Sequence, residues 1–385
     1  MAQFGDFTVD RNSTKYVLGS GGDIISYATD EPAFEFNADG SYKGLLVEPA
    51  ATNVCKQSED INTTWSPSNA TITTNATTAP DGTTTADKLE ATATGSGAQV
   101  NQNITTSAGT YTFSVWLKEG NTTTTAIRLT DAGTADTEAE LTWATRTVSG
   151  TGGVTARVVT DLGSGDWIRI SLTYTLPAGG SDVVRIFAGA STGATAGEYV
   201  HVWGAQVETG PIATSYIPTT TASVTRTKDD ITLGSASSLI GQTEGTLYIE
   251  VDWRGTAGTF QVLLDANDGT SNNEIAIYKD ASIPSQLKMF ARANNDIKTD
   301  QGIDSSGFSG IQKFAFAYKT NDFELYRNGS SISSDTSGSL AALGTLTDID
   351  LGHDSATIQA NMHIRAVALY PKRLSDAEAE ALTTL

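Results

Sequence analysis

The segment WIRISLTYTL, residues 167–176, alternates apolar and polar side chains, and this pattern decides the fold class. Every second residue from Ile168 to Leu176 is apolar, whereas Trp167, Arg169 and Ser171 occupy positions between them. Successive side chains of a β-strand point to opposite faces, so the pattern predicts one core face and one outer face. The segment is therefore predicted to be a half-buried strand of an antiparallel sheet.

Similar short runs recur along the chain, with Gly or Pro between them. QVNQNI (99–104) and TYTFSVWLK (110–118) are two of them, and their spacing is typical of a sandwich or jelly roll over residues 54–225. A second β pattern covers residues 226–385, and within it Asn328-Gly329 is the signal of a tight hairpin. The chain is predicted to be all-β, with two β-sandwich domains in tandem after a short extended N-terminal segment.

The N-terminal segment, residues 1–53, holds short extended pieces such as TKYVLG (14–19) and few apolar residues. A few short strands cannot bury a core of their own, so this segment must pack on a neighbour. The neighbour is either the following domain or another protein subunit. We interpret residues 1–53 as a docking or assembly segment, residues 54–225 as a jelly roll and residues 226–385 as a second sandwich.

Two phrases at the borders of the jelly roll resemble a known type of module. They are GLLVEPAATN (44–53) and WGAQVETGPIATSYIPTTTASVTR (203–226). Both resemble the borders of the carbohydrate-binding-module-like jelly rolls that are common in bacteriophage tail and virion-surface proteins. The second sandwich resembles a laminin-G-like or concanavalin-A-like domain, through GTLYIEVDW (245–253) and the ending MHIRAVALYPKRLSDAEAEALTTL (362–385). In that ending, Ser375 and Glu378 have the spacing of a capping box.

The resemblance implies a non-enzymatic structural protein displayed on a phage virion, as a tail fibre or surface decoration, that binds host surface polysaccharide. Its expected partners are other virion proteins and host cell-surface glycans. One alternative is a capsid or tail decoration that makes mainly protein contacts, and a weaker one is a polysaccharide depolymerase. Virion fibres are usually trimers, and the sequence shows no coiled-coil stem, so the sandwiches themselves would make the contacts of a homotrimer.

Charge and apolar patterning exclude two classes of partner. The formal net charge is −20, from 44 Asp and Glu against 24 Lys and Arg, and such a chain would repel the phosphates of a nucleic acid. No run of about 18 apolar residues is present, so no membrane insertion is expected. The first residues, MAQFGDFTVDR (1–11), lack the basic and apolar regions of a signal peptide. We expect synthesis in the host cytoplasm and a final location on the virion.

Catalytic carboxylates must be considered because concanavalin-A-like sandwiches include glycanases. Retaining glycanases place two carboxylates about 5 Å apart, here on alternate residues of one strand. Glu250 and Asp252 have this alternate spacing, but Arg254 and Gly255 stand where a third carboxylate is expected. The broken pattern predicts a solvated strand face and no enzymatic activity.

Trp116 is the strongest candidate for contact with a sugar. In TYTFSVWLK it shares a face with Ser114 and Lys118, opposite the apolar residues of the strand. An indole beside a hydroxyl and a cation is typical of a glycan platform, because the ring stacks on the apolar side of a pyranose. The same face would also suit a subunit interface or cover by the N-terminal segment. Trp167 and Arg169, which share a face of their own strand, are further candidates.

Oxygen-rich side chains gather in DANDGTSNNE, residues 265–274. The positions of Gly269 and Glu274 do not fit an EF-hand, and a hairpin turn explains the segment. Many lectin-like domains bind calcium, so the resemblance leaves that ion open, with Asp265 and Asp268 as its ligands. No other cofactor is expected. Cys55 is the single cysteine, which excludes an internal disulfide and a cysteine-based metal site.

Overall fold

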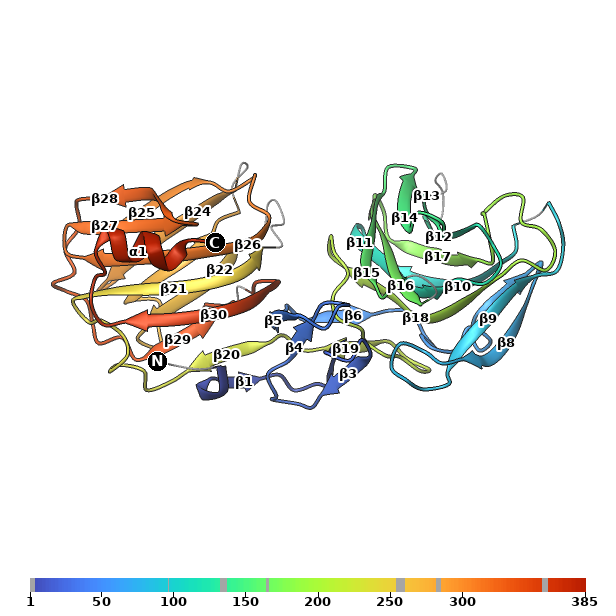
Figure 1. Ribbon diagram of the computed structural model, residues 1–385, viewed down its shortest axis with the longest axis horizontal. Helices are drawn as coiled ribbons and strands as arrows, with labels where there is room; N and C mark the ends of the chain where they lie inside the picture. The colour runs from blue at the N-terminus through green and yellow to red at the C-terminus, as the bar shows by residue number, and fades with distance from the viewer. Residues whose placement is uncertain are drawn as a thin grey trace.

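The computed structural model describes residues 4–95, 97–131, 137–163, 166–253, 260–281, 285–354 and 359–385. Two β-sandwiches lie at the two ends of the molecule, with strands from the N-terminal part of the chain between them (Figure 1). In these ranges one 3-10 turn, η1 (Phe4–Asp6), and one α-helix, α1 (Asp376–Thr383), accompany the strands. Neither is long and apolar enough to cross a membrane. The predicted all-β fold with two sandwiches is confirmed.

The first sandwich consists of two six-stranded sheets. One sheet has the order β14 (Thr147–Thr151), β13 (Thr137–Thr142), β12 (Thr124–Thr130), β17 (Gly180–Phe187), β10 (Gln99–Thr106) and β7 (Ser66–Ser68). The other has the order β15 (Thr155–Asp161), β16 (Trp167–Leu176), β11 (Gly109–Lys118), β18 (Tyr199–Thr209), β9 (Ala86–Ala91) and β8 (Ala70–Thr77). The core between them includes Phe113, Ile168 and Ile170, all fully buried, as the alternation predicts.

The second sandwich consists of two seven-stranded sheets. One has the order β1 (Thr8–Asp10), β20 (Asp230–Leu233), β29 (Asp348–Leu351), β22 (Gln261–Asn267), β23 (Glu274–Lys279), β24 (Gln286–Ala293) and β25 (Asp296–Asp304). The facing sheet has the order β28 (Ser330–Asp335), β27 (Asp322–Arg327), β26 (Gly310–Lys319), β21 (Glu244–Trp253), β30 (Met362–Tyr370), β5 (Tyr42–Val47) and β4 (Phe34–Phe36). Their shared core includes Ile249, Ile277 and Phe316.

Two local features of the second sandwich form as the sequence predicts. The hairpin between β27 and β28 turns at Asn328 and Gly329, whose φ angles of 47° and 86° suit a type I′ turn. Ser375 caps α1, because its hydroxyl accepts from the backbone N–H of Glu378 while the Glu378 carboxylate accepts from the Ser375 N–H. α1 then packs on β26 and β27.

The N-terminal segment completes the second sandwich. β1 pairs with β20 in one sheet, and β5 pairs with β30 in the other, where Leu45 lies opposite Ile364. The first sandwich is therefore inserted between two parts of the second. β6 (Ala51–Asn53) and β19 (Val224–Arg226), where the chain leaves and returns, pair with each other, and β2 (Lys15–Leu18) pairs with β3 (Ile24–Tyr27). A role of this segment in assembly of a particle stays a prediction.

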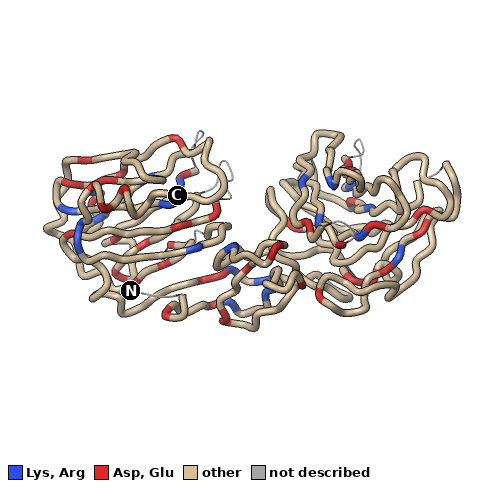
Figure 2. Tube along the Cα trace, viewed as in Figure 1, with Lys and Arg blue, Asp and Glu red and all other residues tan. Residues whose placement is uncertain are grey.

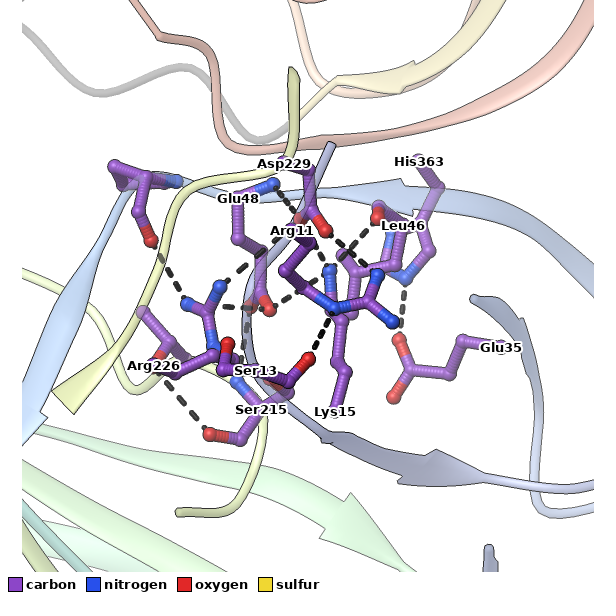
Figure 3. Close-up of polar contacts among 12 residues, drawn as sticks. Arg11, Ser13, Lys15, Glu35, Leu46, Glu48, Ser215, Arg226, Asp229 and His363 are labelled. Atoms are coloured by element: carbon purple, nitrogen blue, oxygen red, sulfur yellow. Dashed lines mark hydrogen bonds and ion pairs between the residues drawn. The ribbon is translucent and has the colours of Figure 1, made fainter. Parts of the chain in front are cut away.

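A buried ion cluster joins the strands between the sandwiches (Figure 3). Asp229 accepts from Arg11 Nη1 at 3.0 Å and from Lys15 Nζ at 2.6 Å. Glu48 lies 3.2 Å from Lys15 Nζ and 3.5 Å from Arg226 Nη2. Burial alone would raise the pKa of Glu48, but Lys15 and Arg226 hold it well below its usual range. Each buried charge has an opposite partner, so removal of one would leave another uncompensated.

Candidate functional site

The outer face of one sheet in the second sandwich carries polar and aromatic side chains in register. One row across β29, β22, β23, β24 and β25 contains Asp350, Asp265, Ala276, Phe290 and Asp300. The next row, from β29 to β24, contains Asp348, Asn267, Glu274 and Arg292. The side chains that alternate with them, such as Ile275 and Ile277, belong to the core. The sheet therefore presents a built polar surface opposite its apolar one.

Two adjoining hollows lie on this face. The smaller, of about 240 Å³, is lined by Phe260, Val262, Asp265, Ser271, Glu274, Ala276, Tyr278, Phe290, Arg292 and Asp354. The larger, of about 310 Å³, is lined by Lys228, Asp230, Thr232, Asn267, Gly269, Asp348, Asp350, His353 and Asp354. Asp354 lines both, so the two hollows adjoin at this residue.

Three aromatic rings form one side of the smaller hollow. Phe260 stacks on Tyr278, with ring centroids 4.7 Å apart and planes inclined by 16°. Phe290 meets Tyr278 edge to face at 5.6 Å, and the Tyr278 hydroxyl donates to Asp300 Oδ1 at 2.8 Å. The guanidinium of Arg292 lies over the Phe290 ring, 5.1 Å from its centroid. These rings form an apolar cluster separate from the core of the sandwich.

Acidic groups form the other side of the hollow. Asp265 is only 1% exposed, and its Oδ2 accepts from Asn267 Nδ2 at 3.1 Å. Burial raises the pKa of Asp265 well above its usual range, and the neighbouring carboxylates Glu274 and Asp350 raise it further. Burial also raises the pKa of Glu274 to about 7, although Arg292 lies 3.2 Å away and lowers it. The site is thus poor in positive charge, within a molecule whose Asp and Glu are spread over both sandwiches (Figure 2).

The residues expected to form a sugar platform on the first sandwich are buried. Trp116 and Trp167 are each 2% exposed, and both pack with Leu18 and Ile24 of the N-terminal segment. Both indoles lie in one buried cluster with residues of the N-terminal segment, and sugar contact at Trp116 and Trp167 stays a prediction. The alternative of cover by the N-terminal segment describes this face.

Polar neighbours of Trp116 are engaged in the same way. Ser114 is fully buried, and its hydroxyl accepts from Arg169 Nη2 at 2.9 Å. Arg169 also donates from Nη1 to the Thr214 carbonyl at 2.8 Å, which ties the strand to the segment that returns from the first sandwich. Lys118 remains partly exposed, and its Nζ lies 3.8 Å from Asp166 Oδ1. These contacts join the strands of this sheet to one another and to the segment after β18.

The two expected calcium ligands lie in different settings. Asp265 lines the smaller hollow, whereas Asp268 is half-buried in the turn after β22, where Thr270 and Asn273 donate to it. The turn is the expected hairpin, with Gly269 at a φ of 80°. The described residues contain no group of three or more His, Cys, Asp or Glu side chains arranged to hold a metal ion. Calcium binding stays a prediction.

Glu250 has a structural partner. Arg365 Nε donates to Glu250 Oε1 at 2.8 Å, and Tyr248 donates to its other oxygen at 3.4 Å. Glu250 and Asp252 both lie on β21, while Arg254 and Gly255, which break the glycanase pattern, lie outside the described residues. The arrangement uses Glu250 to join β21 to β30.

The aromatic residues of the hollow were missed at the level of sequence, although part of their signal is visible. In EIAIYK (274–279) the residues Glu274, Ala276 and Tyr278 alternate with apolar ones, and so occupy the outer face. The same holds for Phe290 and Arg292 in the next strand. Asp265 gives no such signal, because every residue of β22 is buried.

Comparisons with known proteins give local likenesses alone. No protein-family model matches the chain. No curated protein matches it either. A solved structure of the Ruminococcus gnavus IT-sialidase CBM40 bound to α2,3-sialyllactose is similar at 18% identity, over 39% of this chain and 86% of that one, with a TM-score of 0.33.

Two further solved structures are similar over a comparable length. One, of botulinum neurotoxin type C, whose cell entry depends on two ganglioside molecules, is 13% identical over 40% of this chain and 39% of that one, with a TM-score of 0.33. The other, the leech intramolecular trans-sialidase, is 16% identical over 38% of this chain and 24% of that one, with a TM-score of 0.31. Each likeness covers about two fifths of the present chain.

Proposed function

We propose that the protein is a non-enzymatic glycan-binding protein, and that it binds sugar on the outer face of β22, β23 and β24. The observation that carries the proposal is the hollow of about 240 Å³ in which Phe260, Tyr278 and Phe290 lie opposite Asp265 and Glu274. Sugar rings stack their apolar faces on aromatic rings, while their hydroxyls need hydrogen-bonding partners. The hollow offers both on one sheet.

The size of the site suits a short stretch of a polysaccharide. At about 240 Å³ the smaller hollow lies just below the usual range of small-ligand pockets, about 300 to 1,000 Å³, so it suits a single sugar ring. The adjoining hollow of about 310 Å³ offers the polar side chains of Asn267, Asp348 and Asp350 to a neighbouring ring. A glycan chain would therefore cross the strands, from Phe290 toward Asp350.

The resemblance of the border phrases extends the proposal to the place of action. We propose display on the virion of a tailed phage, after synthesis in the host cytoplasm, as a homotrimer in contact with other virion proteins. Mass spectrometry of purified particles and an electron-microscopy map of the intact particle would test this. A chain found free of the particle would contradict it.

The test of the binding site uses substitutions in the aromatic side of the hollow. Phe260→Ala should weaken binding to immobilised host polysaccharide by at least ~10-fold, the scale of a central aromatic contact. Phe260 is half-buried, so this substitution disturbs the fold less than one at the more buried Tyr278. Tyr370→Ala, on the opposite sheet of the same sandwich, is the matched control and should bind as wild type.

Unchanged binding by Phe260→Ala, with Tyr278→Ala also unchanged and folded by circular dichroism, would contradict the site. A wild-type protein that binds no host polysaccharide but incorporates into particles would favour the alternative of a decoration protein with mainly protein contacts. Release of reducing sugar from the polysaccharide would favour the depolymerase alternative.

A further inference from the structure

The smaller hollow contains more negative than positive charge. Among the lining residues that the structure describes, Asp265, Glu274 and Asp354 are acidic and Arg292 is the one cation. Arg292 is already engaged, because its Nη1 lies 3.2 Å from Glu274 Oε1 and donates to the Ser271 carbonyl at 2.7 Å. Neither contact brings positive charge to Asp265.

Asp265 has a buried oxygen with unused hydrogen-bonding capacity. Its Oδ2 accepts from Asn267, whereas Oδ1 has no hydrogen-bond partner within the described part of the chain. Native proteins rarely bury a carboxylate oxygen in this way, because the lost hydration has no replacement. An ammonium group has three N–H donors and a positive charge, so it would supply the hydrogen bond and the charge together.

The aromatic rings of the hollow favour a cation as well. The Phe290 ring already holds the Arg292 guanidinium at 5.1 Å, which is a cation–π contact. Phe260 and Tyr278 offer stacked rings within the same cluster. The ring of a cationic sugar could therefore pack on the aromatic side chains, while its charged group binds the carboxylate of Asp265.

We infer that the hollow selects an amino sugar with a free, protonated amine, whose ammonium group binds Asp265 while its ring packs on Phe260 and Tyr278. The inference rests on the proposed function, that this hollow binds glycans, and adds the charge of the ligand. A bare metal ion fits less well, since no group of three or more potential metal ligands is present among the described residues.

The test compares two disaccharides that differ at the sugar nitrogen, which is a protonated amine in one and an uncharged acetamide in the other. The disaccharide of glucosamine carries free amines, and its N-acetylated form has the same rings and linkage without the charge. By titration calorimetry, the wild-type protein should bind the charged form at least ~10-fold more tightly. Asp265→Asn should lose this preference. Glu380→Gln removes the same charge from the exposed surface of α1 and should keep the preference for the charged disaccharide. This variant controls for the acidic net charge of the protein.

Proton release provides a second readout. Burial, Glu274 and Asp350 hold the pKa of Asp265 above its usual range, and an ammonium partner would lower it. Binding of the charged disaccharide should therefore release protons from the wild-type protein and not from Asp265→Asn. The change is measured as the dependence of the binding enthalpy on the ionisation enthalpy of the buffer.

The remaining outcomes separate the inference from the proposed function. If the wild-type protein binds the two disaccharides with equal affinity and Phe260→Ala binds neither, the amine preference is overturned and the proposed glycan-binding function stands. If Phe260→Ala changes the binding of no glycan, the proposed function itself is overturned. Ethylamine binding as tightly as the amino sugar would overturn the ring contact. Tight binding of Ca²⁺ alone, abolished by Asp265→Asn, would overturn the inference in favour of a metal ion.

Discussion

The outer face of β11 and β16 in the first sandwich and the outer face of β22 to β24 in the second have similar side chains and different environments. The first carries Trp116 beside Arg169, and the second carries Tyr278 and Phe290 beside Arg292. The first face is covered by the chain's own N-terminal segment, whereas the second lines two hollows. Alternation therefore shows which face of a strand a residue occupies, and distant parts of the chain decide whether that face meets solvent.

Deletion of the N-terminal segment, residues 1–53, should have the largest effect on folding and stability. A chain that begins at Val54 lacks β1, β4 and β5 of the second sandwich, and with them Leu45 and Val47 of its core. It also loses Leu18 and Ile24, which cover Trp116. We expect this chain to be largely insoluble or to lack a cooperative unfolding transition for the second sandwich. Sedimentation and thermal unfolding would show this; a soluble chain with two native-like transitions would contradict it.

A single substitution of a residue buried beneath the N-terminal segment should lower the free energy of unfolding without changing the affinity for ligand. Trp116→Ala should lower the free energy of unfolding by about 3 to 5 kcal/mol, because a large buried side chain leaves a cavity. Denaturant titration measures this loss. Phe260→Ala should give the reverse pattern, with weaker glycan binding and a smaller loss of stability. Loss of glycan binding in a folded Trp116→Ala protein would remove the distinction between the two faces.

Two buried carboxylates should respond to pH with opposite sign. The folded pKa of Glu48 is lowered by Lys15 and Arg226, so its contribution to stability is present above the ordinary Glu range and is lost as the pH falls below it. The folded pKa of Asp265 is raised by burial and acidic neighbours, so stability falls as the pH rises from the ordinary Asp range toward the raised value.

Asp265→Asn should therefore stabilise the protein at neutral pH by ~1 kcal/mol or more, the scale of an unsatisfied buried group. The gain should vanish in acid, where Asp265 is protonated in both states. Chemical denaturation over a range of pH measures both effects. If Asp265→Asn is less stable than wild type at neutral pH, the carboxylate has a partner that the described residues do not supply.

The smallest effect on stability is expected for Lys118, at the edge of the outer face of β11 and β16. Lys118→Ala breaks the contact between a partly exposed lysine and the exposed Asp166, and should lower the free energy of unfolding by no more than ~1 kcal/mol. Binding of glycans should be unchanged. A loss of binding in this variant would show that the first sandwich also contacts the ligand, and surface plasmon resonance on the same polysaccharide would detect it.

Local patterns made much of the fold predictable. The alternation over 167–176, the Asn328-Gly329 turn and the Ser375 cap depend on neighbours within a few residues, and all three form as expected. The pairing of β1 with β20 joins residues more than two hundred positions apart, such as Thr8 and Thr232, and nothing local records it. The packing of the N-terminal segment near Trp116 also joins distant parts of the chain, so the sequence offered it only as one of several alternatives.

The site was predictable only in part, for a related reason. Asp265 was singled out for its oxygen-rich surroundings, and it does line the hollow. Its aromatic neighbours come from other strands, and their convergence depends on the register of β22, β23 and β24. A polar side chain on a fully buried strand, such as Asp265 on β22, indicates a binding site only when the residues on the neighbouring strands are also known.

The insertion of one sandwich into the other imposes an order of events during synthesis. β1 leaves the ribosome before its partner β20 exists, and about 220 residues must be added between Asp10 and Asp230. At roughly 5 to 20 residues per second, the early strands wait about 10 to 40 s without a partner. The inserted sandwich can mature during this interval, because all of its strands are already available. Its maturation brings β6 and β19 together, and so returns the growing chain to the waiting strands.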